Sequence, residues 1–192
     1  MKRKQTKNYK SCPAYQSSPN AKQFSKAITL LETLLDQHRK LLVCRINLTA
    51  TGLDGHEDIA ALIRKIKKYY GTDFYGFIWT CEYKQPIGKH YHIVIFLNGS
   101  KFKDDVSRME RYVRYWTLKT GMYAYVSIFD PLKGSIKTTG LLARDDTKAF
   151  DEITFGLSYL CKTSQKPDST ERNFNMTQIK SLIDKEDYRQ SA

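Results

Sequence analysis

The stretch that decides the fold is FYGFIWTCEYKQPIGKHYHIVIFLNG, residues 74–99. Its two halves, 74–83 and 89–97, are rich in the aromatic and β-branched residues that favour strands. Residues 84–88 join them and include a proline and a glycine. So short a connection between two strands predicts an antiparallel hairpin.

One face of this hairpin carries side chains that can bind a metal. Strand side chains alternate, so His90 and His92 project from one face while Tyr91 faces the core. Pairing centred on the loop places Glu82 opposite or diagonal to both histidines. Two imidazoles and a carboxylate suit Mg²⁺ or Mn²⁺ held together with a phosphate oxygen, and Zn²⁺ accepts the same ligands. A lone His-x-His is usually a pair of surface or hydrogen-bonded histidines, and Glu82 is what favours a metal site.

Hydrophobic spacing predicts the elements around the hairpin. Apolar residues three and four apart indicate helices, and strict alternation indicates strands. Residues 130–150 are loop-rich, and residues 163–175 are polar and are expected to form a loop. The other predicted elements are helix 21–39, strand 41–49, turn 51–55, helix 56–70, helix 102–119, strand 122–129, helix 153–162 and a short helix from Met176.

This order of helices and strands predicts an α+β protein, with a mainly antiparallel sheet covered by helices. The 192 residues suit one domain with a single core, which we expect to span residues 21–192. Residues 1–20 form a basic arm that either is a solvated tail or touches phosphates.

The charge of the chain favours a polyanionic partner. The formal net charge is +12, and 13 Tyr and 9 Phe accompany it as residues that can stack on bases. A nucleic-acid partner is therefore favoured over the alternative of a basic soluble protein without one.

The four cysteines form no CxxC pair, so a zinc ribbon is not expected, and free thiols fit a reducing cytosol. No secretory signal and no membrane-spanning stretch is apparent.

A second candidate motif is Tyr159-Leu160-Cys161-Lys162. A tyrosine can attack a phosphodiester and hold the phosphate covalently. A free phenol has a pKa near 10, so it needs a metal, a base or a cation to activate it. Lys162 lies three residues on, which places it on the same side of a helix. Taken alone, a helix that carries a Tyr-x-x-Lys pair usually has no catalytic role, and its two faces simply pack on the protein and meet water.

Together these motifs resemble those of a known family. His90-Tyr91-His92 and the apolar run after it resemble the HUH motif of rolling-circle replication initiators, and residues 159–162 are similar to their YxxK motif. Residues 46–49 resemble their first, less specific strand motif. The amino-acid sequence around these motifs is most similar to that of the inovirus-type (filamentous phage) initiators and their prophage relatives. The resemblance covers about residues 40–180 and rests on residues 88–99, Tyr115-Trp116 and residues 156–162.

This resemblance implies a ferredoxin- or RRM-like sheet with a metal site on its open face. It implies His90 and His92 as ligands, Glu82 as the third, Tyr159 as nucleophile and Lys162 as the residue that orients the phosphate or the tyrosine. Phe155 stands one helical turn before Tyr159, so a single-tyrosine enzyme is expected, and no GxxxxGK[ST] helicase loop occurs.

The implied activity is metal-dependent nicking and joining of single-stranded DNA at a replication origin, through a 5′-phosphotyrosine intermediate. The implied cofactor is Mg²⁺ or Mn²⁺. Single-stranded DNA or an origin hairpin is the expected partner, with a host helicase and polymerase, in the cytoplasm of a bacterial host.

Two other interpretations remain open at this point. One is a non-catalytic nucleic-acid-binding regulator on an RRM-like sheet, which exposed aromatic residues on central strands would favour. The other is a transposase or conjugative relaxase with the same chemistry. Basic and polar residues that could contact DNA, or could equally belong to a solvated face, are Asn47, Thr49, Arg111, Arg114, Lys119 and Lys137.

Overall fold

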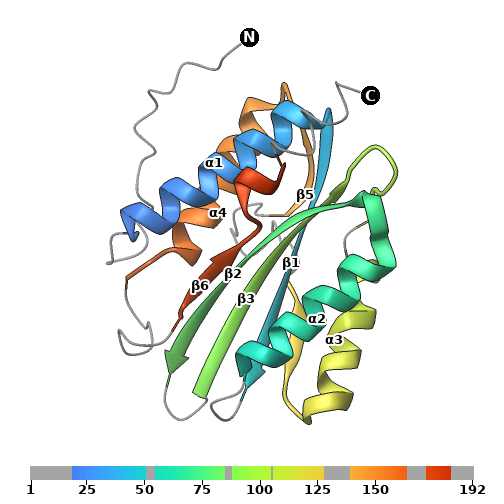
Figure 1. Ribbon diagram of the computed structural model, residues 1–192, viewed down its shortest axis with the longest axis vertical. Coiled ribbons are helices and arrows are strands. Elements are labelled where there is room, and N and C mark those ends of the chain that lie inside the picture. The colour runs from blue at the N-terminus through green and yellow to red at the C-terminus, as the bar shows by residue number, and fades with distance from the viewer. Residues whose placement is uncertain are drawn as a thin grey trace, which may run out of the picture.

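The predicted hairpin is the centre of the sheet in the computed structural model of the protein. Strands β2 (Phe74–Lys84) and β3 (Gly88–Asn98) pair antiparallel, with Glu82 directly opposite His90. The structure describes residues 19–50, 55–84, 88–104, 106–127, 139–163 and 172–182. Figure 1 shows the sheet between two pairs of helices, which confirms the predicted α+β class.

The inner part of the sheet has the connectivity of a ferredoxin-like fold. The chain runs β1-α2-β2-β3-α3-β4, and the strand order is β4-β1-β3-β2-β6, with every pairing antiparallel. A short fifth strand pairs with β1 beside β4. The further elements of this part are β1 (Lys40–Ala50), α2 (Gly55–Tyr70), the 3₁₀ turn η1 (Gly71–Asp73), α3 (Val106–Thr120) and β4 (Ala124–Val126).

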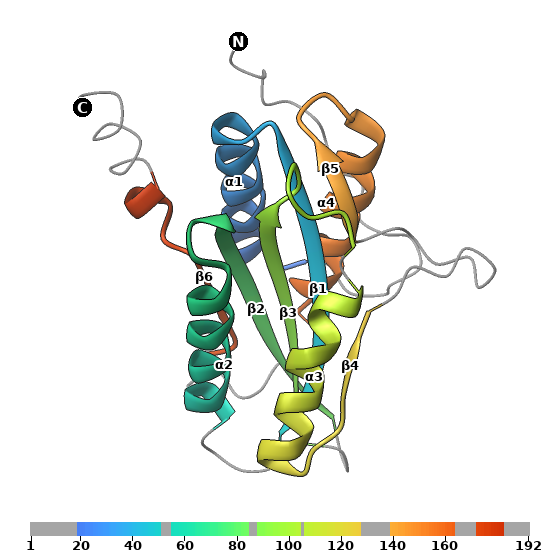
Figure 2. The same cartoon turned by 90° about the vertical axis from the view of Figure 1, so that its right-hand side faces the viewer.

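One face of the sheet is covered by α2 and α3 (Figure 2). The alternating residues of β1 that point to this side are apolar from Leu42 to Ala50, and Tyr91 of β3 is fully buried there. Trp116 of α3 donates from its indole nitrogen to the Thr49 carbonyl at 3.0 Å. This layer therefore holds α3 firmly against β1.

The opposite face is covered by α1 (Ala21–Gln37) and α4 (Thr147–Leu160). Their apolar stripes pack on the sheet residues Leu41, Val43, Ile78, Val94 and Phe96. These five positions lie at one end of the central strands, so α1 and α4 meet an apolar surface over that half of the face.

The structure corrects several predicted boundaries. The loop-rich stretch 130–150 contains strand β5 (Gly140–Ala143) and the first turn of α4, which begins at Thr147 rather than at residue 153. Asp146 sets that start because its carboxylate accepts from the Ala149 backbone at 2.9 Å. The loop expected at 163–175 runs into strand β6 (Phe174–Met176).

Two further boundaries move. The helix predicted from residue 102 begins at Val106, and the strand predicted at 122–129 is β4 alone, with residues 128–129 outside the described part. The helix predicted from Met176 corresponds to helical residues 179–182. Residues 1–18 of the predicted basic arm are also outside the described residues.

Three cysteines, Cys44, Cys81 and Cys161, are buried with free thiols, as their apolar contexts predict. Within the described ranges, none of the helices has the length and apolarity that crossing a bilayer requires.

Candidate functional site

Half of the face under α1 and α4 is polar. On each central strand the alternating residues of this face change from apolar to polar along the strand, and on β1 the change comes one row earlier, because Arg45 is level with Val94 and Ile78. The polar positions are Arg45, Asn47 and Thr49 on β1, His90 and His92 on β3, and Thr80 and Glu82 on β2. Because the strands are in register, these residues form rows across the sheet, and His90, His92 and Glu82 share one face as predicted.

A chain of polar contacts joins this face to the end of α4. The His92 Nε2 atom lies 3.4 Å from a Glu82 carboxylate oxygen, and the Lys162 ammonium lies 3.2 Å from that same oxygen. The ammonium also donates to the Tyr159 hydroxyl at 3.1 Å. We call Tyr159, Lys162, Glu82, His92 and Asn47 the polar cluster. It unites two motifs that are almost seventy residues apart in the sequence.

Asn47 orients the His92 ring. Its side-chain oxygen lies 2.5 Å from His92 Nδ1, whereas the Arg45 guanidinium is 3.4 Å from the same nitrogen. The shorter contact favours a proton on Nδ1 that is donated to Asn47. The other ring nitrogen, Nε2, faces Glu82. Metal-binding histidines are commonly oriented in this way by a carbonyl oxygen behind them.

The backbone around Lys162 is held by the start of α1. The Asn20 amide donates to the Cys161 carbonyl at 2.6 Å, and Pro19 forms an isolated β-bridge with Lys162. Asn20 also caps α1, because its side chain accepts from the Gln23 backbone at 3.1 Å. Lys162 lies just beyond the last residue of α4, and these contacts aim its side chain at the sheet.

The charges of the cluster are largely removed from water. Only 8% of the Lys162 side chain and 8% of the Glu82 side chain are exposed. A buried charge is tolerated when it is paired and hydrogen-bonded, and each of these two supplies the other's counter-charge. The Arg45 guanidinium lies 6.0 Å from the Tyr159 ring centre. Two cations therefore stand beside the tyrosine, where they would attract a phosphate.

The donors of this face fit a divalent cation chemically. His92 Nε2 and a Glu82 carboxylate oxygen lie 3.4 Å apart, and imidazole nitrogens and carboxylate oxygens are both common ligands of divalent ions. His90, half-buried, is the register partner of Glu82 and lies on the same face. In the part of the chain that the structure describes, no three His, Cys, Asp or Glu side chains already converge as a metal-binding group.

The residues predicted to contact DNA fall in different places. Asn47 and Thr49 are buried on the site face, where Asn47 holds His92 and the Thr49 hydroxyl donates to the Tyr123 carbonyl at 2.7 Å. Arg111 and Arg114 are exposed on α3, which covers the other face of the sheet. Lys119, also on α3, pairs with Asp58 at 2.5 Å. Lys137 lies outside the described residues.

Arg45 was not predicted as a site residue. It alternates with Asn47 and Thr49 along β1, and this alternation is the signal in the sequence that could have identified it. Nothing in the sequence marks it more strongly than the many other basic residues, because its closeness to Tyr159 depends on how α4 packs.

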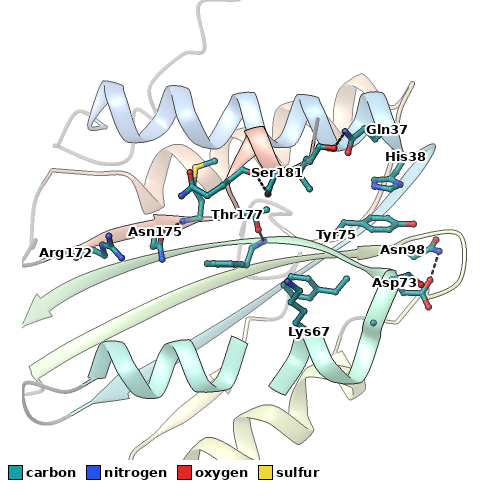
Figure 3. A pocket seen from close by; sticks show the side chains of 17 residues that line it. Gln37, His38, Lys67, Asp73, Tyr75, Asn98, Arg172, Asn175, Thr177 and Ser181 are labelled. Atoms are coloured by element: carbon teal, nitrogen blue, oxygen red, sulfur yellow. Dashed lines mark hydrogen bonds between the residues drawn. The ribbon is translucent and has the colours of Figure 1, made fainter. Parts of the chain in front are cut away.

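A separate groove lies at the other end of β2, with a volume of about 1050 Å³. Figure 3 shows the His38 ring stacked on Tyr75, with ring centres 3.5 Å apart, and Asp73 bonded to Asn98. The described residues that line it include no member of the polar cluster. The groove therefore does not belong to the candidate site.

Comparison with protein-family models, with curated proteins and with solved structures finds no match to this chain.

Proposed function

We propose that this chain is a single-tyrosine, HUH-type enzyme that nicks and rejoins single-stranded DNA at a replication origin, and so initiates rolling-circle replication. The observation that carries the proposal is the link from the Tyr159 hydroxyl through Lys162 to Glu82 and His92. A purely structural tyrosine at the end of a helix has no need of a buried ammonium that is paired with a carboxylate, which in turn contacts an imidazole.

In this proposal Tyr159 is the nucleophile. Its hydroxyl oxygen loses its proton and attacks the phosphorus of one phosphodiester, the bond from phosphorus to the 3′-oxygen breaks, and the leaving oxygen takes up a proton as a 3′-hydroxyl, so that no net proton is gained or lost. The 5′-phosphate remains on the tyrosine. Attack by a 3′-hydroxyl on that phosphotyrosine reverses the step and rejoins the strand, which requires no ATP because the bond energy is conserved.

The neighbouring residues have supporting roles. Lys162 holds the tyrosine hydroxyl and, together with Arg45, offers positive charge to the phosphate that approaches it. Glu82 keeps the Lys162 ammonium in place. Asn47 keeps the His92 ring in one orientation.

Glu82, His90 and His92 are the residues that would hold Mg²⁺ or Mn²⁺. When bound there, the ion would supply charge stabilisation to a phosphodiester under attack.

A specific observation favours a second candidate function, that of a nucleic-acid-binding regulator without catalysis. Tyr123 and Tyr125 are exposed on the polar face of the sheet, at the edge strand β4 rather than on the central strands, and RRM-like proteins bind bases through aromatic rings on a sheet face. This candidate does not explain the buried contacts of Tyr159, so we rank it second.

The test is a covalent-adduct assay. Protein is mixed with a pool of labelled single-stranded DNA and Mn²⁺ and then separated under denaturing conditions. We expect an adduct with the wild type, and none with Tyr159→Phe or after addition of EDTA. Tyr69→Phe is the matched control, since Tyr69 is an exposed tyrosine on α2.

An adduct formed by Tyr159→Phe would overturn the assignment of the nucleophile. Wild-type adduct formation by His90→Ala or Glu82→Gln would overturn the assignment of the ligands. DNA binding without any adduct, for a pool that covers all short sequences, would favour the regulator.

A further inference from the structure

Two exposed tyrosines stand at the edge of the sheet on β4. Tyr123 is 68% exposed and Tyr125 is 45% exposed. Their ring centres are 5.6 Å apart with an angle of 37° between the planes. Tyrosine is intermediate in burial, and two exposed rings side by side form an aromatic patch of the kind that marks interaction sites.

Both rings lie on the face of the sheet that carries the polar cluster. Ala124 and Val126, which alternate with them, pack toward α3 on the other face. Tyr125 is the register partner of Asn47, and Asn47 is the register partner of His92. Directly opposed residues on antiparallel strands share a face, so the rings are level with the site.

The distance from the rings to the site follows from the strand order. Only β1 separates β4 from β3, so Tyr125 and His92 are two strand spacings apart, which is about 10 Å. A single strand of DNA that passes over the polar cluster and across β1 would meet Tyr125 and then Tyr123 at the edge of the sheet.

The backbone that carries these rings is firmly attached. The Thr49 amide and hydroxyl both donate to the Tyr123 carbonyl, at 2.9 and 2.7 Å. On the other side of Tyr125, the Ser127 amide donates to the Arg45 carbonyl at 2.9 Å. The rings are thus presented from a fixed position, which lowers the entropy lost when a base stacks on them.

We propose that Tyr123 and Tyr125 form a stacking platform for the bases of single-stranded DNA next to the polar cluster. The inference rests on the proposed function for its choice of ligand, and the net charge of +12 agrees with a polyanion. Stacking accepts any base, because every base has a π-face, so the platform holds and aligns the strand without selecting its sequence.

The test measures binding apart from cleavage. Fluorescence anisotropy of a labelled single-stranded oligonucleotide is recorded in EDTA with Tyr123→Ala, Tyr125→Ala and the double variant, each in the Tyr159→Phe background. Each alanine is expected to weaken binding by roughly 5- to 150-fold, the range for loss of one stacked base. The corresponding phenylalanine variants keep the ring and are expected to bind within about twofold of the parent.

Tyr69→Ala is the matched control, an exposed tyrosine of α2 whose loss is expected to leave binding unchanged. Equal binding by the parent and the double alanine variant would overturn the platform. A loss of DNA affinity in Tyr69→Ala as large as that in the Tyr123 and Tyr125 variants would overturn it as well. The platform and the enzyme can fail separately. If the alanine variants bind DNA more weakly but the wild type forms no adduct, the platform stands and the nuclease is rejected. If the wild type forms an adduct but the alanine variants bind as well as their parent, the nuclease stands and the platform is rejected.

Discussion

The buried ammonium of Lys162 is the residue-scale feature that joins the parts of the site. It lies 3.1 Å from the Tyr159 hydroxyl and 3.2 Å from Glu82. Removing one member of a buried ion pair leaves the other charge uncompensated, and this costs roughly 3–5 kcal/mol in well-buried pairs. Lys162 should therefore affect both stability and catalysis.

For Lys162→Met, which retains the apolar stem, we predict a loss of about 3 kcal/mol in the free energy of unfolding. We also predict a fall of about 10²-fold in the rate of adduct formation, as expected when one charged donor to the reacting phosphate is lost. Urea unfolding and single-turnover adduct assays measure the two effects.

The double variant Glu82→Gln/Lys162→Met is the control for the ion pair, because a neutral amide needs no counter-charge. We expect it to recover a large part of the lost stability but not the activity. Additive destabilisation by the two substitutions would argue against the coupling, and wild-type adduct rates in Lys162→Met would remove the lysine from the mechanism.

At the scale of elements, the turn after β3 is fastened to the start of β2. The Asp73 carboxylate accepts from Asn98 at 2.9 Å and from Lys101 at 2.6 Å. The chain passes so close to β1 here that a Cβ on Gly99 would come within 2.5 Å of the Leu41 backbone. The hydrogen bond from Lys101, and then that from Asn98, lowers the pKa of Asp73 below its ordinary value.

Because its pKa is lowered in the folded protein, ionised Asp73 stabilises the fold at pH values above the ordinary aspartate pKa. This contribution is lost as the pH falls through the lowered pKa. We predict that Asp73→Asn is less stable than the wild type at pH 7 by at most about 1 kcal/mol, because Lys101 is largely exposed. The difference should shrink under acid conditions. Thermal unfolding of both proteins across pH 2–7, a range chosen around the ordinary aspartate pKa of about 3.9, measures it. A difference that does not vary with pH would contradict this role for the ion pair.

At the scale of the whole molecule, the two faces of the sheet have different characters. The polar cluster and the exposed pair Tyr123 and Tyr125 lie on one face, and α2 and α3 cover the other. Arg111 and Arg114 belong to the α3 layer, and Arg111 lies 4.4 Å from the ring centre of Tyr69. Exposed charges separated by more than about 8 Å are largely screened at physiological salt.

We therefore predict that the double charge reversal Arg111→Glu/Arg114→Glu leaves the nicking of a short single-stranded oligonucleotide within about twofold of wild type at physiological salt. Arg45→Ala, on the site face, should reduce it by about tenfold or more. Adduct rates for the two variants at equal DNA saturation make the comparison. A larger loss from the α3 reversal than from Arg45→Ala would mean that the DNA path crosses the α3 face.

The sequence by itself determined the elements and one half of the site. The alternation in residues 74–99 and the short loop between the two strands are local properties, so they specify the hairpin and place Glu82 opposite or diagonal to both histidines, and the structure then pairs it with His90. Periodicity likewise identified the helices, because an amphipathic stripe is visible in a single segment. Strands β5 and β6 were not predicted, because each has only three or four residues and owes its extended form to pairing with β1 or β2.

Only the tertiary structure decided how the halves of the site meet. Tyr159-x-x-Lys162 carries no information about which strand it faces, and its position follows from α4 packing beside α1 on the apolar half of the sheet. The same packing brings Arg45 beside Tyr159, while the opposite layer carries Arg111 and Arg114 away from it. Long-range packing of this kind depends on the combined shape of many buried side chains, and no local pattern in the chain encodes it.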